Sequence, residues 1–221
     1  GKFSTQLLHD DNDDYIKSEL EDYLSILEDE LNTDRIRVNL MVVEKLFKFE
    51  VRKGGTGNRI LNRTVVTPAN LTVIRRICIC GDGENERRRL SGEIVWKVGE
   101  GCAGKAVEDS ALLFYKDDES PHERDTYNLT AEQFDATDPI AAVVSIPLYE
   151  ADKLVADGED LDSPMAIITV DTSSREVARD IKQALNDDDK REVFHPDLTT
   201  TDKGKKAQSN ILNIAAALTA P

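Results

Sequence analysis

A glycine-rich string with a cysteine inside it contains the residues best placed to do chemistry in this sequence. Gly99, Gly101 and Gly104 have the G-x-G-x-x-G spacing, follow a strand-like run and open a helical stretch. That spacing is typical of a turn that holds the phosphates of a dinucleotide. Cys102 stands at the start of the helical stretch, where a helix N-terminus lowers the pKa of a thiol and favours the nucleophilic thiolate. Dinucleotide binding and thiol redox chemistry are therefore two functions to weigh.

The segment after the glycines argues against a dinucleotide site. Only about six residues separate Gly104 from the next strand-like run at 111–115, whereas a parallel crossover connection needs a dozen or more. The βαβαβ alternation of dinucleotide-binding folds is also missing around the string. We therefore expect a tight glycine turn that lets a helix pack close to a strand.

The other residues able to bind metals or attack substrates lack a recognisable spacing. Cys78 and Cys80 lie two residues apart in a strand-like run, the three histidines are scattered, and no second cysteine pair exists. Zinc ligands need a different spacing. The acidic clusters at 117–119 and 187–189 lack the spacing and the glycine of a calcium loop. The sequence predicts no metal site and no catalytic residue, and it requires no cofactor.

Composition excludes further classes of protein. The chain has 221 residues, with 28 basic against 43 acidic side chains, which gives a net charge of −15. Because such a chain repels phosphate backbones, we expect no nucleic-acid partner. No apolar stretch approaches the roughly 20 residues of a membrane helix, and few cysteines suit a reducing compartment, so a cytoplasmic protein without membrane insertion is expected. Because the first residue is Gly1 and not Met, we expect either a tag scar or an excised fragment.

The order of helical and strand patterns predicts an α+β fold. The clearest helix follows the acidic run at 10–14 and repeats its apolar residues at helical spacing as far as Leu31. Strands are predicted at 35–43, 46–51, 71–80, 94–98, 111–115, 140–148 and 165–170. Further helices are predicted after the glycine string and at 130–134, 174–185 and 207–218. A run of strands flanked by helices is typical of an antiparallel α+β domain.

Four segments of the chain, in this order and spacing, resemble the GAF domain family. They are the glycine turn at 96–106, the strand at 111–115, the strand at 141–149 with its Pro-Leu-Tyr end, and the strand at 164–171 with its Val-Asp end. The resemblance covers roughly residues 13–219. It implies a central antiparallel sheet of about six strands, with the N- and C-terminal helices packed on one face.

The resemblance also implies a domain organisation and a function. Residues 1–12 would be a disordered or tag-derived acidic lead, and 13–221 a single domain with insertions at 116–139 and 174–202. GAF domains bind small molecules or act as dimerisation modules within larger signalling proteins. We therefore expect a non-catalytic sensory or regulatory domain that acts on a flanking effector domain.

A ligand site in such a domain would lie beneath the glycine turn. By the resemblance, aromatic walls and one carboxylate would surround it, and the candidates are Trp96, Cys102, Tyr115, Phe134 and Asp171. The competing interpretation is that Trp96 and Phe134 only seal that face of the sheet. The identity of the ligand stays open.

An enzymatic branch of the family supplies the alternative function. Free methionine-(R)-sulfoxide reductase has a cysteine in the same turn, one residue beyond Cys102, at the position of Ala103 here. Its other cysteines follow the turn, and none occurs from 103 to 148 in this chain. A redox enzyme that uses Cys102 is therefore the first alternative, and a dinucleotide-binding protein that uses the glycine string is the second.

The terminal helices carry a pattern that suits a homodimer. Their apolar residues step by four and three, as in a heptad seam: Ile16, Leu20, Tyr23 and Leu27 in the first helix, and Ile211, Ala215 and Leu218 in the last. Two helices from each protomer would form a four-helix bundle. The competing prediction is that both helices pair within one chain and cover the sheet.

Overall fold

The computed structural model describes residues 10–49, 68–82, 95–116, 128–129, 133, 140–149, 164–195 and 199–219. An antiparallel sheet and several helices make up these residues, so the predicted α+β class is confirmed. In chain order the elements are α1 (Asp10–Leu31), β1 (Arg37–Phe49), β2 (Pro68–Gly81), β3 (Val95–Lys97), α3 (Gly101–Asp109), β4 (Leu113–Lys116), β5 (Ala142–Leu148), β6 (Ala166–Thr172), α6 (Arg175–Leu185), the 3₁₀-helix η1 (Lys190–Val193) and α7 (Asp202–Thr219).

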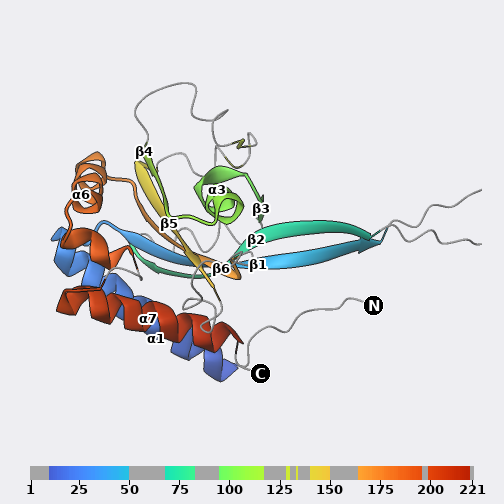
Figure 1. Cartoon of the computed structure of the whole chain (residues 1–221), viewed down its shortest axis with the longest axis horizontal. Helices are drawn as coiled ribbons and strands as arrows, with labels where there is room; N and C mark the ends of the chain where they lie inside the picture. The colour runs from blue at the N-terminus through green and yellow to red at the C-terminus, as the bar shows by residue number, and fades with distance from the viewer. Residues whose placement is uncertain are drawn as a thin grey trace, which may run out of the picture.

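The first and last strands of the chain lie at the centre of the sheet. The six strands have the order β3-β2-β1-β6-β5-β4, and each neighbouring pair is antiparallel. β1 runs without a break to Phe49, where two separate strands were predicted. Among the described residues, its outer part pairs only with β2. That part of the ribbon extends beyond the rest of the sheet (Figure 1).

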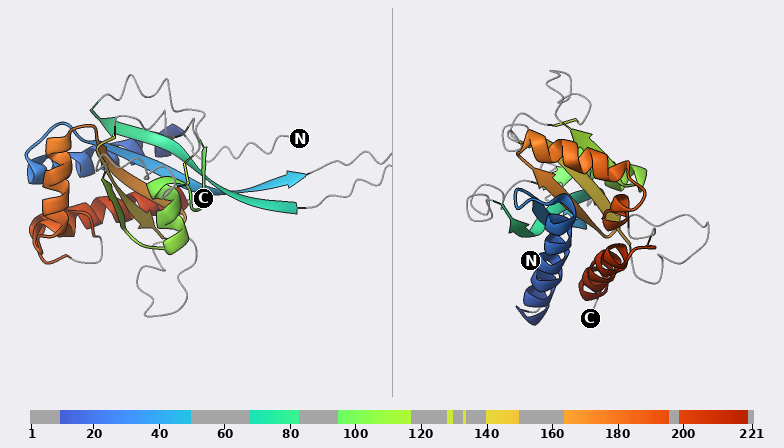
Figure 2. Two further views of the ribbon diagram at one scale, coloured as in Figure 1. Left: turned by 90° about the horizontal axis from the view of Figure 1, so that it is seen from above. Right: turned by 90° about the vertical axis from the view of Figure 1, so that its left-hand side faces the viewer.

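One face of the sheet is apolar and is covered by α1 and α7. Alternation along the strands turns Val38 and Leu40 of β1, with Ile168 and Val170 of β6, toward these helices. Figure 2 shows α1 and α7 side by side across this face. α1 begins at Asp10, so the acidic run belongs to the helix instead of preceding it.

The residues predicted to form a dimer interface are buried within the single chain. Six of them are at most 1% exposed, and Leu218 packs against the same core: Ile16, Leu20, Tyr23, Leu27, Ile211, Ala215 and Leu218. Side chains enclosed by the sheet and the neighbouring helix have no surface to offer a second copy. The assignment of these residues to an interface is therefore corrected: the helices pair within one chain and cover the sheet.

The segment from Ser174 to Asp202 contributes to the same core. Val177 and Ile181 of α6, with Val193 and Phe194 at the end of η1, pack among the residues under α1. The hydroxyl of Tyr23, fully buried in α1, donates a hydrogen bond to the carbonyl of Val193 at 2.8 Å. The part of the chain predicted as a polar insertion thus helps to hold the terminal helices in place.

A buried carboxylate joins η1 to the start of α7. The Glu192 side chain accepts hydrogen bonds from the hydroxyl and the backbone N–H of both Thr200 and Thr201, at 2.5–3.0 Å. These bonds, the one from the Thr200 hydroxyl foremost, lower the pKa of Glu192 to about 2. A Cβ on Gly204 would lie 2.5 Å from the Glu192 carboxylate, so this close approach requires glycine.

Replacing this carboxylate should change how stability depends on pH. The folded state holds the pKa of Glu192 below its ordinary value of 4.5. Its contribution to stability is therefore complete above that value and is lost as pH falls toward about 2. We expect Glu192→Gln to lower the free energy of unfolding at neutral pH. In acid, the difference in free energy of unfolding between this variant and the wild type should become smaller. Urea unfolding across the pH range measures this difference, and Glu21→Gln, at an exposed position, is the control. A difference that does not vary with pH would contradict the lowered pKa of Glu192.

Candidate functional site

The glycine string forms a tight turn that connects β3 to α3. Gly99 and Gly101 have φ angles of +83° and +64°, which other residues rarely adopt. The Gly99 N–H donates to the carbonyl of Gly104 at 2.9 Å. A Cβ on Gly104 would lie 2.4 Å from the Lys97 carbonyl oxygen. The glycines therefore let the helix pack directly against the strand, as predicted.

The setting of this turn differs from that of a dinucleotide site. β3 and β4, the strands on either side of α3 in the sequence, lie at opposite edges of the sheet. The strand pairings among the described residues are antiparallel, so they contain no parallel strand–helix–strand unit around the glycines. A dinucleotide site of the G-x-G-x-x-G type is built on such a unit, and the second alternative function loses its structural basis.

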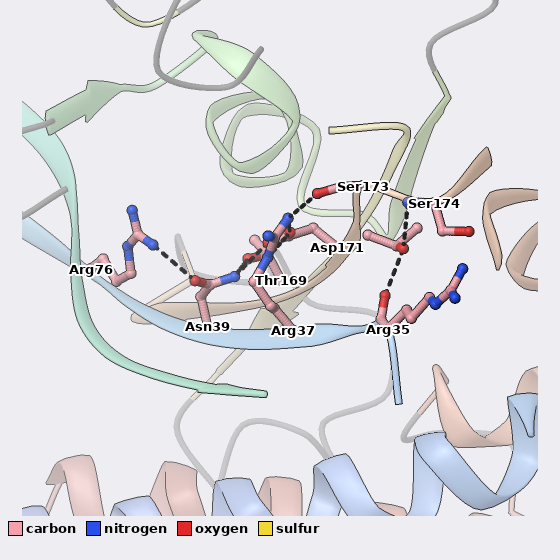
Figure 3. A network of polar contacts seen from close by, with 9 residues as sticks. Arg35, Arg37, Asn39, Arg76, Thr169, Asp171, Ser173 and Ser174 are labelled. Atoms are coloured by element: carbon pink, nitrogen blue, oxygen red, sulfur yellow. Dashed lines mark hydrogen bonds and ion pairs between the residues drawn. The ribbon is translucent and has the colours of Figure 1, made fainter. Parts of the chain in front are cut away.

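The face of the sheet toward α3 carries a cluster of buried polar side chains, here called the polar floor. It consists of Arg37 and Asn39 from β1 with Thr169 and Asp171 from β6, which are between 2% and 6% exposed. Figure 3 shows these side chains on the α3 side of β1, with α1 and α7 beyond its other side. Alternation along the same two strands therefore places these polar side chains on one face and aliphatic side chains on the other.

An ion pair forms the centre of the polar floor. The Arg37 Nε–H donates to Asp171 Oδ1 at 2.6 Å, and the Arg37 Nη2 group contacts the same oxygen. Asn39 donates from Nδ2 to Asp171 Oδ2 at 2.8 Å and to the Thr169 hydroxyl at 3.0 Å. Arg76 of β2 donates from Nη1 to the Asn39 side-chain oxygen at 3.1 Å. Both carboxylate oxygens of Asp171 are thus engaged, and the charge of Arg37 is matched.

Ser145 of β5 extends the polar floor toward α3. It pairs in register with Thr169, is fully buried, and its hydroxyl lies beside the thiol of Cys102. The Cys102 Sγ also contacts the carbonyl of Val143 at 3.9 Å. Burial raises the pKa of Cys102 to about 12, and the neighbouring Ser145 offsets only part of this rise. The thiol is protonated at neutral pH, so burial outweighs the helix N-terminus and makes Cys102 a poor nucleophile.

An apolar cluster lies on the same face of the sheet, next to the polar floor. Trp96 of β3 is 7% exposed and belongs to a cluster with Met41, Ile74 and Ile167 from the sheet. Ala103, Ala106 and Val107 of α3 complete this cluster. A polar region and an aromatic region therefore share one covered face.

Three of the five predicted ligand residues come together on this face. Trp96, Cys102 and Asp171 lie there, but Asp171 is bonded to Arg37 and Asn39 instead of standing alone as a ligand-orienting carboxylate. Tyr115 is in β4, and its side chain lies outside the described residues, as do Phe134 and most of the insertion at 116–139.

The residues of the polar floor other than Asp171 were missed by sequence reasoning. Arg37 and Asn39 alternate with Val38 and Leu40, a pattern that predicts a strand with one face in water. The available signal was the interruption of the apolar run at 165–170 by Thr169, followed by Asp171. Polar residues at matching positions of two apolar strands indicate a buried polar face if the strands pair.

Comparison with protein-family models and with curated proteins finds no match for this chain. The described residues include no group of three or more side chains able to hold a metal ion. Among them, no helix combines the length and the apolar character needed to cross a membrane.

The close contact at Gly104 makes a prediction about stability. Gly104→Ala forces a methyl group against the Lys97 carbonyl, and overpacking of this kind costs about 1–3 kcal/mol. The neighbouring Lys105→Ala removes only a partly exposed ion pair with Glu108 and should change stability by less than about 1 kcal/mol. Urea unfolding of both variants measures the difference, and equal midpoints for Gly104→Ala and wild type would refute the close packing.

The buried ion pair makes a second prediction. Arg37→Leu leaves the Asp171 carboxylate buried without its cation and should cost about 3–5 kcal/mol. Adding Asp171→Leu removes the stranded charge and should restore part of the loss. The matched control is Arg75→Leu, because Arg75 pairs with Glu44 while 43% exposed, and about 1 kcal/mol or less is expected there. Denaturant unfolding of the wild type, the two single variants and the double variant measures these changes in the free energy of unfolding. Similar losses for Arg37→Leu and Arg75→Leu would argue against a buried ion pair.

Proposed function

We propose that this chain is a non-catalytic regulatory domain of the GAF type, which binds a small molecule between its sheet and α3. The proposal rests on the polar floor, because hydrogen-bonding side chains gathered on one covered face can orient a ligand. The opposite face is apolar and is occupied by α1 and α7. The six-stranded sheet and the position of both terminal helices on one face agree with what the GAF resemblance implies.

The chemistry of the face favours a ligand of low net charge. Asp171 neutralises Arg37, so the four residues of the polar floor carry no net charge of their own, and Arg76 of β2 donates to Asn39 at their margin. Trp96 and Ile167 supply apolar surface on the same side. A molecule with a flat or apolar body and a few hydroxyl or amide groups suits this combination better than a phosphate ester.

Alternation along β1 and β6 provides a route from the ligand to the rest of the protein. Asn39 and Asp171 face the proposed ligand, whereas their chain neighbours Leu40 and Val170 pack against the terminal helices. A ligand that shifts either strand therefore shifts residues in contact with α1 and α7. Those helices would pass the change to a flanking effector domain or to a partner, by favouring one of two arrangements.

The state of Cys102 supports the absence of catalysis. A thiol with a pKa of about 12 is almost fully protonated at neutral pH, and reduction of a sulfoxide by thiolate attack needs the ionised form. We therefore expect no thiol-dependent turnover of free methionine sulfoxide. Measurable turnover that Cys102→Ser abolishes would favour the reductase alternative instead.

Trp96 offers a direct test of ligand binding, because it is the only tryptophan of the chain and lies on the proposed face. Native mass spectrometry of the purified protein would identify a retained molecule, and titration of that molecule should change Trp96 fluorescence to saturation. Ser145→Ala should weaken binding roughly two- to tenfold, the effect of one lost hydrogen bond. The exposed Ser25→Ala should not.

Two results would count against the proposal. One is a purified protein from which native mass spectrometry recovers no small molecule. The other is a bound molecule whose affinity is the same in Ser145→Ala and Ser25→Ala, because it would have to lie elsewhere on the chain.

A further inference from the structure

Gln133 is a buried amide that joins the insertion predicted at 116–139 to the glycine turn. Its side chain belongs to a residue that is only 5% exposed. The Gln133 Nε2 group donates to Glu100 Oε2 at 2.9 Å and to the carbonyl of Val95 at 3.2 Å. Val95 begins β3, and Glu100 is the residue directly before α3. One side chain therefore holds both the strand and the turn that lead into the helix.

The Glu100 carboxylate is turned back toward β3, the strand that precedes it. Its Oε2 accepts from the backbone N–H of Lys97 at 3.0 Å, and its Oε1 accepts from the Lys97 Nζ group at 3.2 Å. Burial acts to raise the pKa of Glu100, but the hydrogen bonds from Gln133 and Lys97 outweigh it and lower the pKa. The carboxylate is therefore ionised at neutral pH, and a hydrogen bond to an ionised group is stronger than one between neutral groups.

Two neighbours of Gln133 in the sequence also contact the glycine turn. The Asn128 amide donates to the carbonyl of Gly99 at 3.3 Å. Leu129 packs against the apolar cluster that contains Trp96, which is only 7% exposed. Asn128, Leu129 and Gln133 are here called the cover, because they close the aromatic end of the α3-facing side of the sheet.

We infer that the Glu100–Gln133 pair controls access to the α3-facing side of the sheet. While the two side chains are bonded, Leu129 is held against Trp96 and the turn is held against β3. β3 is at the edge of the sheet and has β2 alone beside it among the described residues, so its backbone groups can bond to water once Gln133 leaves. The cover can therefore open without unfolding of the sheet, and a molecule can then enter between the sheet and α3.

This inference rests on the proposed function, because access matters only if a molecule binds on this face. Its test needs no ligand, so the two can fail separately. A protein that retains no molecule would refute the proposed function, whereas the opening of the cover would still be measurable. A cover that does not depend on Gln133 would refute the present inference and leave ligand binding untouched.

Hydrogen exchange of the Trp96 indole N–H measures how often the cover opens. Trp96 is the only tryptophan of the chain, so NMR shows a single indole signal to follow. Gln133→Ala should make this exchange roughly tenfold faster, the effect of losing one hydrogen bond to a charged group. The matched control is Asn213→Ala, which removes the same kind of amide–carboxylate bond, to Glu19 at 3.0 Å between α7 and α1. It should leave the indole exchange unchanged.

The backbone amide of Val170 distinguishes opening of the cover from a loss of overall stability. Val170 is fully buried in β6, which has a strand on each side, so its amide should exchange only when the sheet unfolds. In Gln133→Ala, exchange of the Trp96 indole should accelerate while exchange of the Val170 amide does so much less. Acceleration of both by the same factor would mean that Gln133 only stabilises the fold, and it would overturn the inference.

An exchange of the two side chains tests whether the bond between them is responsible. Gln133→Glu places two carboxylates together and should accelerate the indole exchange at least as much as Gln133→Ala. Adding Glu100→Gln lets the amide at position 100 donate to the carboxylate at position 133, so the indole exchange should slow again. Recovery should be partial, because the carbonyl of Val95 still lacks its donor.

Two further outcomes would overturn the inference. One is an indole exchange rate that is the same in Gln133→Ala and in the wild type. The other is a double variant whose indole exchanges as fast as that of Gln133→Glu. If Gln133→Ala does not fold, Gln133→Met takes its place, because methionine keeps the length of the side chain and lacks the amide donor.

Discussion

The buried ion pair between Arg37 and Asp171 is the contact on which the rest of this structure depends. It joins β1 to β6, the pairing that connects β3-β2-β1 to β6-β5-β4 in the described sheet. Two charges removed from water are tolerated only when their remaining hydrogen-bonding capacity is satisfied. Asn39 satisfies the second carboxylate oxygen, and Ser173 accepts from the guanidinium at 3.4 Å. The polar floor can therefore be understood as the set of side chains that this pair requires.

The two faces of β1 and β6 bury different kinds of side chain. One face holds the ion pair and its partners beneath α3, and the other buries aliphatic side chains under α1 and α7. Because neighbouring residues of a strand point to opposite faces of the sheet, a shift of the strand moves the side chains on both faces. Tyr23 in the interior of α1 bonds to the carbonyl of Val193 in η1, and Glu192 of η1 accepts hydrogen bonds from the residues just before α7. A shift of the central strands would therefore act on helices that are held at these points. We propose that this coupling would let a ligand on one face act on the helices of the other.

Local patterns predicted most elements of the fold, but not the partners of polar residues. Some features depend only on residues close in sequence and could therefore be predicted. They are the helical spacing in α1, the alternation in β2 and the glycine turn before α3. Arg37 and Asp171 are 134 residues apart, and nothing local distinguishes a buried arginine from a solvated one. The stripes of α1 and α7 were also ambiguous, since a helix has the same pattern whether it packs on its own sheet or on a second copy. The pairing of Glu192 with Thr200 and Thr201 was missed because both segments look like polar loop.

The central claim is that the α3-facing side of the sheet is a binding surface, and backbone NMR tests it most directly. Amide shifts recorded while the molecule retained by the protein is added back should change first at Asn39, Ser145, Thr169 and in α3. Smaller changes should follow at Leu40 and Val170, which pass the effect toward α1 and α7. Shifts confined to the exposed surfaces of α1, α6 and α7, with the α3-facing residues unchanged, would contradict the account.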